Sequence, residues 1–372
     1  MSKLPMSNKI IGWDIGGAHL KAALLDEHGE VLQALQLPCP LWKGLDYLER
    51  AILTALQPQG LSPQNIPAKA GYSCVKAFKI KPAEVTHAVT MTGELVDLFQ
   101  NRHEGVIAIS TLAAKLLGKD TLFYAANDGF VRLERVSALT ASIASANWHV
   151  SASALAMQVN DALFIDIGST TTDIIAISNG KLNSTNVSDA ARMADDSLVY
   201  TGVVRTPVMA LAQKLFVDNV ETNVAAEYFA TMADVYRLTN ELLPEHDMAE
   251  TADGKGKTAL ESARRLARMV GHDVESKPMQ TWLNLANTCK TLHMQQIKSA
   301  VLKHLKSNMT IIGAGAGSFL VKQIADDLDI KFIHAWESIS TCLPAHIDEN
   351  KKHNLEVCFP AFAVAILARQ HA

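Results

Sequence analysis

The sequence lacks the cysteine pairs that a disulfide scaffold or a cysteine zinc site requires. Its five cysteines are an odd number, lie far apart and include no Cys-x-x-Cys pair. They are Cys39, Cys74, Cys289, Cys342 and Cys358. We therefore expect reduced thiols in a cytoplasmic protein.

Long apolar runs and an excess of charge of one sign are also missing. No stretch reaches the roughly 18 apolar residues of a membrane-spanning helix. The polar start Met1–Lys3 leads into a strand without a signal-type apolar core. The net charge is −4 and the charged residues are dispersed, which disfavours nucleic acid as a partner. The composition predicts a globular protein without a membrane or nucleic-acid partner.

Length and pattern predict two domains of α/β type. Single cores rarely grow beyond about 250–300 residues, and this chain has 372. Strand-like runs alternate with helical spacing, as in α/β proteins. We place a first domain at 1–157 and a second at 158–372, with a helix-rich insertion at about 207–306. The helices predicted in this insertion are Pro207–Phe216, Val224–Leu243, Thr258–Val270 and Met279–Lys306.

The segment Leu163–Asp173 carries the strongest chemical signal. An apolar strand leads into Asp166 and Gly168, and a second apolar strand follows Asp173. Gly168 permits a tight turn and close approach of a ligand to the backbone. The turn hydroxyls and N–H groups suit phosphate oxygens, and both carboxylates are hard ligands for Mg²⁺. An ordinary hairpin with these residue types is the alternative. The predicted phosphate-binding residues of the turn are Ser169, Thr170 and Thr171.

The same pattern occurs earlier, at Ile10–Gly17, where an apolar strand ends in Asp-Ile-Gly-Gly. Asp14 occupies the place of the first aspartate of the later segment, and Gly16 and Gly17 form the turn. Lys21, on the strand that leaves this turn, is placed to reach an anionic ligand, with a solvated lysine as the alternative. The repetition favours a phosphate and metal site over two unrelated hairpins.

Two later features add candidate anion-binding groups. Gly313, Gly315 and Gly317 lie at a strand-to-helix junction, where a helix N-terminus attracts negative charge. A tight packing turn is the alternative. Arg205 stands alone in the apolar, glycine-containing loop Tyr200–Pro207, a setting that favours a bidentate anionic partner or a structural ion pair.

Two further segments contain groups that could act on a substrate. Glu94 is a candidate general base, although it could equally serve the N-terminus of a helix that we expect to open at Thr92. The segment Asp253–Thr258 resembles part of a Walker A loop, but its glycine spacing is wrong and no buried strand precedes it. We exclude a P-loop and retain a flexible basic loop that closes over an anionic substrate.

The two Asp-Ile-Gly turns and the later glycine junction resemble, in their order and spacing, the sugar kinase, Hsp70 and actin superfamily. The resemblance implies a two-domain, actin-like ATPase fold of the ribonuclease H-like type, with two related domains facing a cleft. It also implies that the aspartate turns hold phosphate and metal, and that the glycine loop at 313–317 lies near a nucleoside.

Shorter segments resemble the hydantoinase/oxoprolinase-related proteins linked to tetrahydromethanopterin-dependent one-carbon transfer. These segments are Gly12–Ala22, Met91–Asp97, Ala146–Trp148, Asp166–Asp173 and Tyr200–Pro207. The resemblance implies a transferase of methanofuran biosynthesis that condenses 5-(aminomethyl)furan-3-yl methyl diphosphate with γ-glutamyltyramine and releases diphosphate. Asp14, Asp166 and Glu94 are then the catalytic candidates. Mg²⁺ is the expected cofactor, with Asp14, Asp166 and Asp173 as its ligands.

The implied partners are a small-molecule diphosphate and a phenolic amine, and a homo-oligomer is compatible with them. His19 and Leu20 stand where kinase-like first loops carry polar residues, so this interpretation does not require ATP. The alternatives are an ATP-dependent small-molecule kinase, an oxoprolinase- or hydantoinase-like hydrolase, and a nucleotide-responsive scaffold for one-carbon transfer.

Overall fold

The computed structural model describes residues 9–57, 77–183, 187–339 and 348–371, which form two compact units. The segments of the first unit are Met1–Asn160, Ile177–Ser188 and Ala335–Ala372; those of the second are Asp161–Ala176 and Asp189–His334. Residues Met1–Lys3, Cys74 and Cys342 lie outside the described ranges. The domain division at 157 and 158 stays a prediction.

The first unit is built on a mixed sheet with the strand order β3-β2-β1-β4-β5-β6. β2 is antiparallel to β1 and β3, whereas β4 is parallel to β1 and β5 is parallel to β4. The strands are β1 (Ile10–Ile15), β2 (His19–Leu25), β3 (Val31–Pro38), β4 (Thr86–Met91), β5 (Leu122–Tyr124) and β6 (Phe130–Val131).

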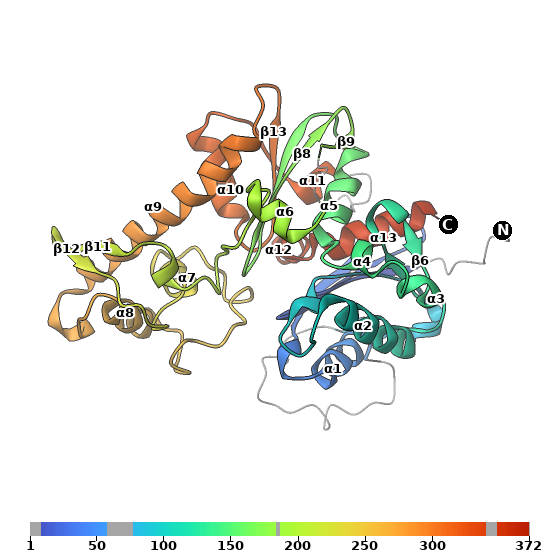
Figure 1. Cartoon of the computed structure of the whole chain (residues 1–372), viewed down its shortest axis with the longest axis horizontal. Helices are drawn as coiled ribbons and strands as arrows, with labels where there is room; N and C mark the ends of the chain where they lie inside the picture. Colours follow the sequence, from blue (N-terminus) through green and yellow to red (C-terminus); the bar gives the residue numbers. More distant parts are fainter. Residues whose placement is uncertain (1–8, 58–76, 184–186, 340–347, 372) are drawn as a thin grey trace. The chain divides into compact units, whose positions relative to one another are not determined.

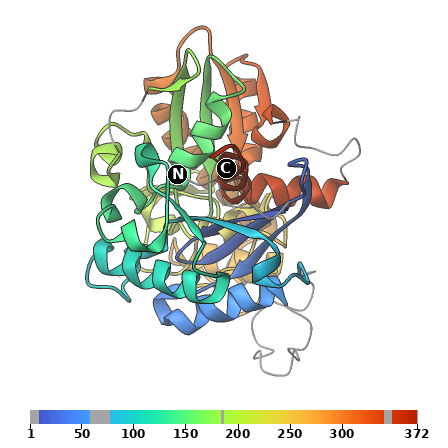
Figure 2. The same ribbon diagram turned by 90° about the vertical axis from the view of Figure 1, so that its right-hand side faces the viewer.

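Helices cover both faces of this sheet (Figures 1 and 2). α1 (Leu45–Leu56) and α2 (Arg102–Leu117) pack on the face to which Trp13 contributes. α5 (Asn147–Ala156) and α13 (Phe359–His371) lie on the other face. Side chains alternate between the faces of a strand, so the residues next to Trp13 in sequence point toward α13.

The second unit repeats this arrangement. Its sheet has the order β10-β8-β7-β13-β14, with β9 paired to β8, and β13 runs parallel to both β7 and β14. The strands are β7 (Ala162–Ile167), β8 (Thr172–Ser178), β9 (Lys181–Leu182), β10 (Leu198–Val199), β13 (Thr310–Ala314) and β14 (Phe332–His334). In each sheet a strand pair is flanked by parallel strands from later in the chain. This repeated order confirms the actin-like, ribonuclease H-like α/β fold.

The insertion of the second unit contains α7 (Met232–Leu238), α8 (Ala259–Arg268) and α9 (Met279–His304). The helices predicted at Thr258–Val270 and Met279–Lys306 are therefore confirmed. The helix predicted at Pro207–Phe216 is wrong. The chain forms a short 3-10 turn and then the hairpin of β11 (Lys214–Val217) and β12 (Val220–Asn223).

Local turn and capping chemistry explains both errors in this insertion. Asp218 and Asn219 adopt left-handed φ values of 46° and 67°, as the tight turn of a hairpin requires. The helix predicted at Val224–Leu243 is wrong over most of its length, because helix begins only at Met232. Thr231 and Asp234 form a capping box that fixes this start.

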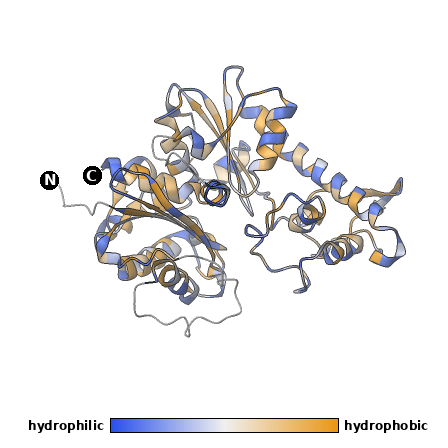
Figure 3. Cartoon of the chain, turned by 180° about the vertical axis from the view of Figure 1, so that it is seen from behind, coloured by the Kyte–Doolittle hydropathy of each residue, from blue (hydrophilic) through white to orange (hydrophobic). Residues whose placement is uncertain are grey.

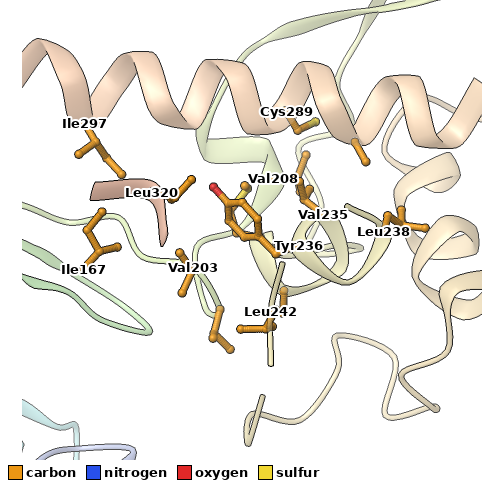
Figure 4. Packing of buried hydrophobic residues seen from close by; sticks show 14 of the residues in the cluster. Ile167, Val203, Val208, Val235, Tyr236, Leu238, Leu242, Cys289, Ile297 and Leu320 are labelled. Atoms are coloured by element: carbon orange, nitrogen blue, oxygen red, sulfur yellow. The ribbon is translucent and has the colours of Figure 1, made fainter. Parts of the chain in front are cut away.

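Buried apolar side chains fill the space between sheets and helices, and orange colour is prominent on the strands in Figure 3. In the second unit, Tyr236 lies among Val203, Cys289 and Leu320 (Figure 4).

No helix in the described ranges is both long and apolar enough to cross a membrane. The remaining helices are α3 (Leu133–Val136), α4 (Thr140–Ile143), α6 (Asp189–Ala194), α10 (Ser318–Asp327), α11 (Ala335–Ser338) and α12 (Glu349–Val357).

The three described cysteines are buried thiols without a disulfide. Burial raises the pKa of Cys39, Cys289 and Cys358 to about 12. Each thiol therefore stays protonated at neutral pH and serves as a small apolar group.

Candidate functional site

The first aspartate turn joins β1 to β2 and is held by backbone hydrogen bonds. Gly16 N–H donates to His19 O at 3.0 Å, and the neighbouring segment closes on the turn through a bond from Leu41 N–H to Gly17 O at 3.0 Å. Asp14, at the end of β1, is 2% exposed. These bonds give the turn one conformation, with a buried carboxylate at its base.

Lys21 lies beside Asp14, and its contact with an anionic ligand stays a prediction. The two residues are direct partners in the β1–β2 register, and Lys21 Nζ lies 3.6 Å from Asp14 Oδ2. The Lys21 side chain keeps 21% of its surface exposed. The ammonium group therefore neutralises the aspartate and retains access to solvent.

Glu94 occupies a buried position after β4. Ser145 Oγ donates to Glu94 Oε1 at 2.8 Å, and the Glu94 side chain is 1% exposed. The helix expected to open at Thr92 is wrong. Only a 3-10 turn covers Gly93–Leu95, and α2 begins later, at Arg102. Glu94 as the base stays a prediction.

The second aspartate turn joins β7 to β8. Gly168 N–H donates to Thr171 O at 2.9 Å, and Ser169 Oγ lies 3.4 Å from Thr170 Oγ1. Asp166 and the turn residues Gly168–Thr171 are all partly exposed. The predicted carboxylate, glycine and hydroxyls therefore lie together at one end of the sheet.

Asp173, predicted as a third metal ligand, has a protein partner. Its Oδ1 atom accepts a hydrogen bond from Arg192 Nη2 at 2.7 Å in an ion pair whose arginine is 1% exposed. Arg192 also donates to Ser197 O at 2.8 Å. The role of Asp173 as a metal ligand stays a prediction, and its observed contact is a structural one.

Backbone hydrogen bonds hold the Arg205 loop against this turn. Arg205 N–H donates to Ser169 O at 2.8 Å, and Val203 N–H donates to Gly168 O at 3.1 Å. A Cβ atom added to Gly202 would lie 2.5 Å from Gly168 O, so only glycine allows this approach. The Arg205 side chain itself is exposed. The structure thus places an arginine-bearing loop next to the hydroxyl turn, while an anionic partner for Arg205 stays a prediction.

A buried polar chain that sequence reasoning missed supports this loop. Tyr236 OH lies 2.7 Å from His293 Nδ1, and His293 Nε2 lies 2.8 Å from Thr201 Oγ1. Thr201 Oγ1 donates to Thr206 Oγ1 at 3.3 Å, and Thr206 Oγ1 accepts from Gly202 N–H at 2.8 Å. Burial lowers the pKa of His293 to about 4, so the imidazole is neutral and positions the loop. Nothing in the local sequence around His293 points to this role.

The glycine junction at 313–317 lies against the end of β7. Gly317 N–H donates to Ile167 O at 2.8 Å, and a Cβ atom added to Gly315 would overlap Asp166 Oδ1 and Ile167 O. Gly313 is crowded by Phe332, 2.7 Å from its added Cβ. Packing therefore accounts for these glycines, while their contact with a nucleoside stays a prediction.

The segment Asp253–Thr258 is anchored to the helical insertion. Arg265 Nη1 donates to Asp253 Oδ1 at 3.0 Å and to Gly256 O at 3.1 Å, and Lys257 pairs with Asp247 at 3.3 Å. Thr258 caps α8. These bonds give the segment a structural role in the insertion.

The donor atoms of the two turns suit Mg²⁺. Asp14 gives the first turn a carboxylate, and in the second unit Asp166 lies with the turn hydroxyls, so each turn by itself carries the hard oxygen ligands that Mg²⁺ prefers. Within the described ranges there is no group of three or more His, Cys, Asp or Glu side chains arranged for a metal. A metal ion at either turn would therefore need further oxygens from substrate and water, as is common for Mg²⁺.

Known proteins similar to this chain include two archaeal enzymes. The enzyme named (4-{4-[2-(gamma-L-glutamylamino)ethyl]phenoxymethyl}furan-2-yl)methanamine synthase from Methanocaldococcus jannaschii is 27% identical over 369 residues, 98% of this chain and 99% of its own. The protein of the same name from Methanococcus vannielii is 28% identical over 213 residues, 56% of this chain and 91% of its own.

Solved structures give more distant matches. Component A of (R)-2-hydroxyglutaryl-CoA dehydratase from Acidaminococcus fermentans matches with a TM-score of 0.45 and 10% identity, covering 98% of this chain and 99% of its own. This similarity is too remote to inform function.

A family comparison matches most of the chain, including the second aspartate turn and the Arg205 loop. The sequence model of the hydantoinase/oxoprolinase family matches residues 85–345, most of the chain. The matched range includes Glu94, the second turn with its two flanking strands, and the glycine junction. The chain belongs to the hydantoinase/oxoprolinase family.

Proposed function

We propose that this protein is a transferase of methanofuran-type cofactor biosynthesis. It joins 5-(aminomethyl)furan-3-yl methyl diphosphate to γ-glutamyltyramine and releases diphosphate. The name shared by the two archaeal relatives supports this assignment, and the first of them aligns over 98% of this chain.

The reaction exchanges one carbon–oxygen bond for another. The phenol oxygen of the tyramine attacks the furan methylene, the bond from that carbon to diphosphate breaks, and the phenol proton passes to a base. The furan ring stabilises positive charge at the methylene, while cationic groups stabilise the departing diphosphate. The protein must therefore supply an oxyanion site and a proton acceptor.

The second aspartate turn is the proposed oxyanion site. Its hydroxyls and N–H groups lie beside the Arg205 loop, which is fixed by the 2.8 Å bond from Arg205 N–H to Ser169 O. Guanidinium groups and turn amides are common ligands of phosphate oxygens. Arg205 and residues Ser169–Thr171 are thus the proposed diphosphate ligands in this unit.

Mg²⁺ is the proposed cofactor, with Asp166 as its candidate carboxylate in the second unit and Asp14 as the corresponding candidate in the first. When bound, it would neutralise charge on the diphosphate. Lys21 supplies a second cation next to Asp14, at 3.6 Å. Glu94 is the proposed proton acceptor, and its hydrogen bond from Ser145 would hold the carboxylate in place.

The decisive experiment combines the furan diphosphate, γ-glutamyltyramine and Mg²⁺ with the purified protein in the absence of ATP. Mass spectrometry follows diphosphate and the ether product together, and we expect them in equal amounts. An Asp14→Asn, Asp166→Asn double variant should form product at least a hundredfold more slowly, because it lacks both proposed metal ligands.

Two outcomes would contradict the proposed activity, and a third would contradict its metal site. Turnover only after ATP is added would instead indicate an ATP-dependent kinase or hydrolase. Nucleotide binding without turnover, together with co-purification of an enzyme of one-carbon transfer, would indicate a scaffold. Unchanged activity of the double variant would remove the metal site from the mechanism.

A further inference from the structure

A row of polar side chains crosses the first sheet next to the Asp14 turn. Gln36 on β3 is the register partner of Lys21 on β2, Lys21 is the partner of Asp14 on β1, and Asp14 is the partner of Thr90 on β4. Register partners on neighbouring strands point to the same face. An amide, an ammonium group, a carboxylate and a hydroxyl thus lie side by side on this face.

This face is covered by protein. Gly12, two residues before Asp14, points to the same face, and a Cβ atom added there would overlap Ala361 O of α13. Its own cross-strand row consists of small residues, Ala34, Ala23 and Ala88. Helix α13 therefore packs on the row of small residues around Gly12, and the polar row around Asp14 lies two residues further along the strands.

The start of α13 marks the position of the polar row. Lys21 and Asp14 are the charged groups that influence the pKa of Cys358, the residue before α13. Despite their polarity, the members of the row are largely shielded from solvent, with exposures of 8% for Gln36, 2% for Asp14 and 0% for Thr90. Only Lys21 has substantial access to solvent.

Thr90 is the member of this row that folding does not explain. Its Oγ1 atom is buried and has no hydrogen-bond partner within the described part of the chain. Valine has the same shape and would avoid burying a polar group without a partner. By contrast, the hydroxyl of buried Thr121 donates to Gly118 O at 2.7 Å.

We propose that the row Gln36–Lys21–Asp14–Thr90 binds an oxyanion of the phosphate or diphosphate class, and that the Thr90 hydroxyl donates a hydrogen bond to it. The proposal rests on the proposed function, whose substrate carries such a group. Lys21 balances the charge of Asp14, so Gln36 and Thr90 supply neutral donors on either side of the ion pair. Thr90 is then a binding residue that lies in a strand, outside the turn motif.

The test uses Thr90→Val in the full-length protein, with two separate readouts. Without ligand, the melting temperature should rise by about 2 °C, because valine removes a buried hydroxyl without a partner. Calorimetric titration with inorganic diphosphate and Mg²⁺ should show affinity about tenfold weaker. Thr90→Ser, which keeps the hydroxyl, should retain the affinity.

Thr121→Val is the matched control, since it removes a hydroxyl that has a partner in the same unit. It should lower the melting temperature and leave diphosphate affinity unchanged. A lower melting temperature for Thr90→Val would overturn the proposal, because the hydroxyl would then stabilise the fold. Unchanged diphosphate affinity would also overturn it, because the hydroxyl would then not bind the anion.

The control for the proposed function is titration of the wild-type protein with two anions in turn, magnesium diphosphate and magnesium ATP. If it binds magnesium ATP and not diphosphate, the proposed function fails, and the Thr90 comparison is decided by the ATP affinities. If it binds neither anion, both proposals fail. If it binds diphosphate and Thr90→Val binds equally well, only the role of Thr90 fails.

Discussion

At the scale of single residues, the glycines selected from the sequence have different causes. Gly315 has a φ of +85°, and an added Cβ at Gly317 would lie 2.5 Å from Ile167 Cγ2, so the protein itself requires both. Gly168 has neither constraint. An added Cβ would meet Thr171 O at 3.5 Å, an ordinary contact, in the described structure. Close approach of a ligand is the remaining reason for glycine at this turn.

Gly168→Ala should therefore separate stability from binding. We expect the free energy of unfolding to change by less than about 0.5 kcal/mol, while the affinity for diphosphate with Mg²⁺ falls about tenfold or more, because the methyl group occupies space that the ligand needs. Urea unfolding and calorimetric titration measure the two quantities. Gly317→Ala is the control that should lose stability, and full affinity in Gly168→Ala would show that no ligand approaches this residue.

At the scale of elements, α13 and β1 depend on each other. Gly12 is the point of closest approach, where an added Cβ would also lie 2.9 Å from Ala365 N. Both contacts are with helix backbone, which cannot move aside as a flexible side chain can. The C-terminal helix is thus a part of the core of the first unit.

Gly12→Ala should destabilise the first unit by about 3 kcal/mol or more, because the helix must shift away from the sheet. Urea unfolding followed by the fluorescence of buried Trp13, in a protein whose other four tryptophans are replaced by phenylalanine, reports on this unit. Removing Phe359–Ala372 should have a larger effect in the same assay. Wild-type stability of Gly12→Ala would mean that the helix is not packed as described.

Much of the element pattern was predictable, since it depends on local periodicity. The strands around both Asp-Ile-Gly turns and the helices α8 and α9 follow from apolar spacing. The β11–β12 hairpin was not predicted, because its tight Asp218-Asn219 turn lies in a segment with helix-like apolar spacing. Turn chemistry overrode periodicity there.

At the scale of the whole molecule, each unit contains a buried neutral histidine. In the first unit, His87 Nδ1 accepts from Trp13 Nε1 at 3.1 Å and His87 Nε2 donates to Pro82 O at 3.1 Å. Burial lowers the pKa of His87 to about 4, as it does for His293 in the second unit. Both histidines must gain a proton in the unfolded chain below about pH 6.5.

Acid should therefore destabilise both units. The folded-state pKa values lie below the unfolded ones, so this contribution to stability is complete above about pH 6.5 and is lost as pH falls toward 4. The slope is up to about 1.4 kcal/mol per pH unit for each histidine, about 3 kcal/mol each in total. Urea unfolding between pH 7 and 4.5 measures it.

Substitutions of the histidines show which residues cause this pH dependence of stability. His87→Gln and His293→Gln should each reduce the slope by about one proton. Equal slopes in all proteins would show that neither buried histidine titrates on unfolding.

By itself, the sequence determined the α/β class, the two aspartate turns and the glycine junction, because strand period, glycine and turn hydroxyls act within a few residues of one another. Only the tertiary structure decided that Arg192 pairs with Asp173, that His293 supports the Arg205 loop, and that Thr90 stands beside Asp14. These pairings depend on strand register and on contacts between residues far apart in the chain, which are fixed by packing of the whole core and leave no local pattern.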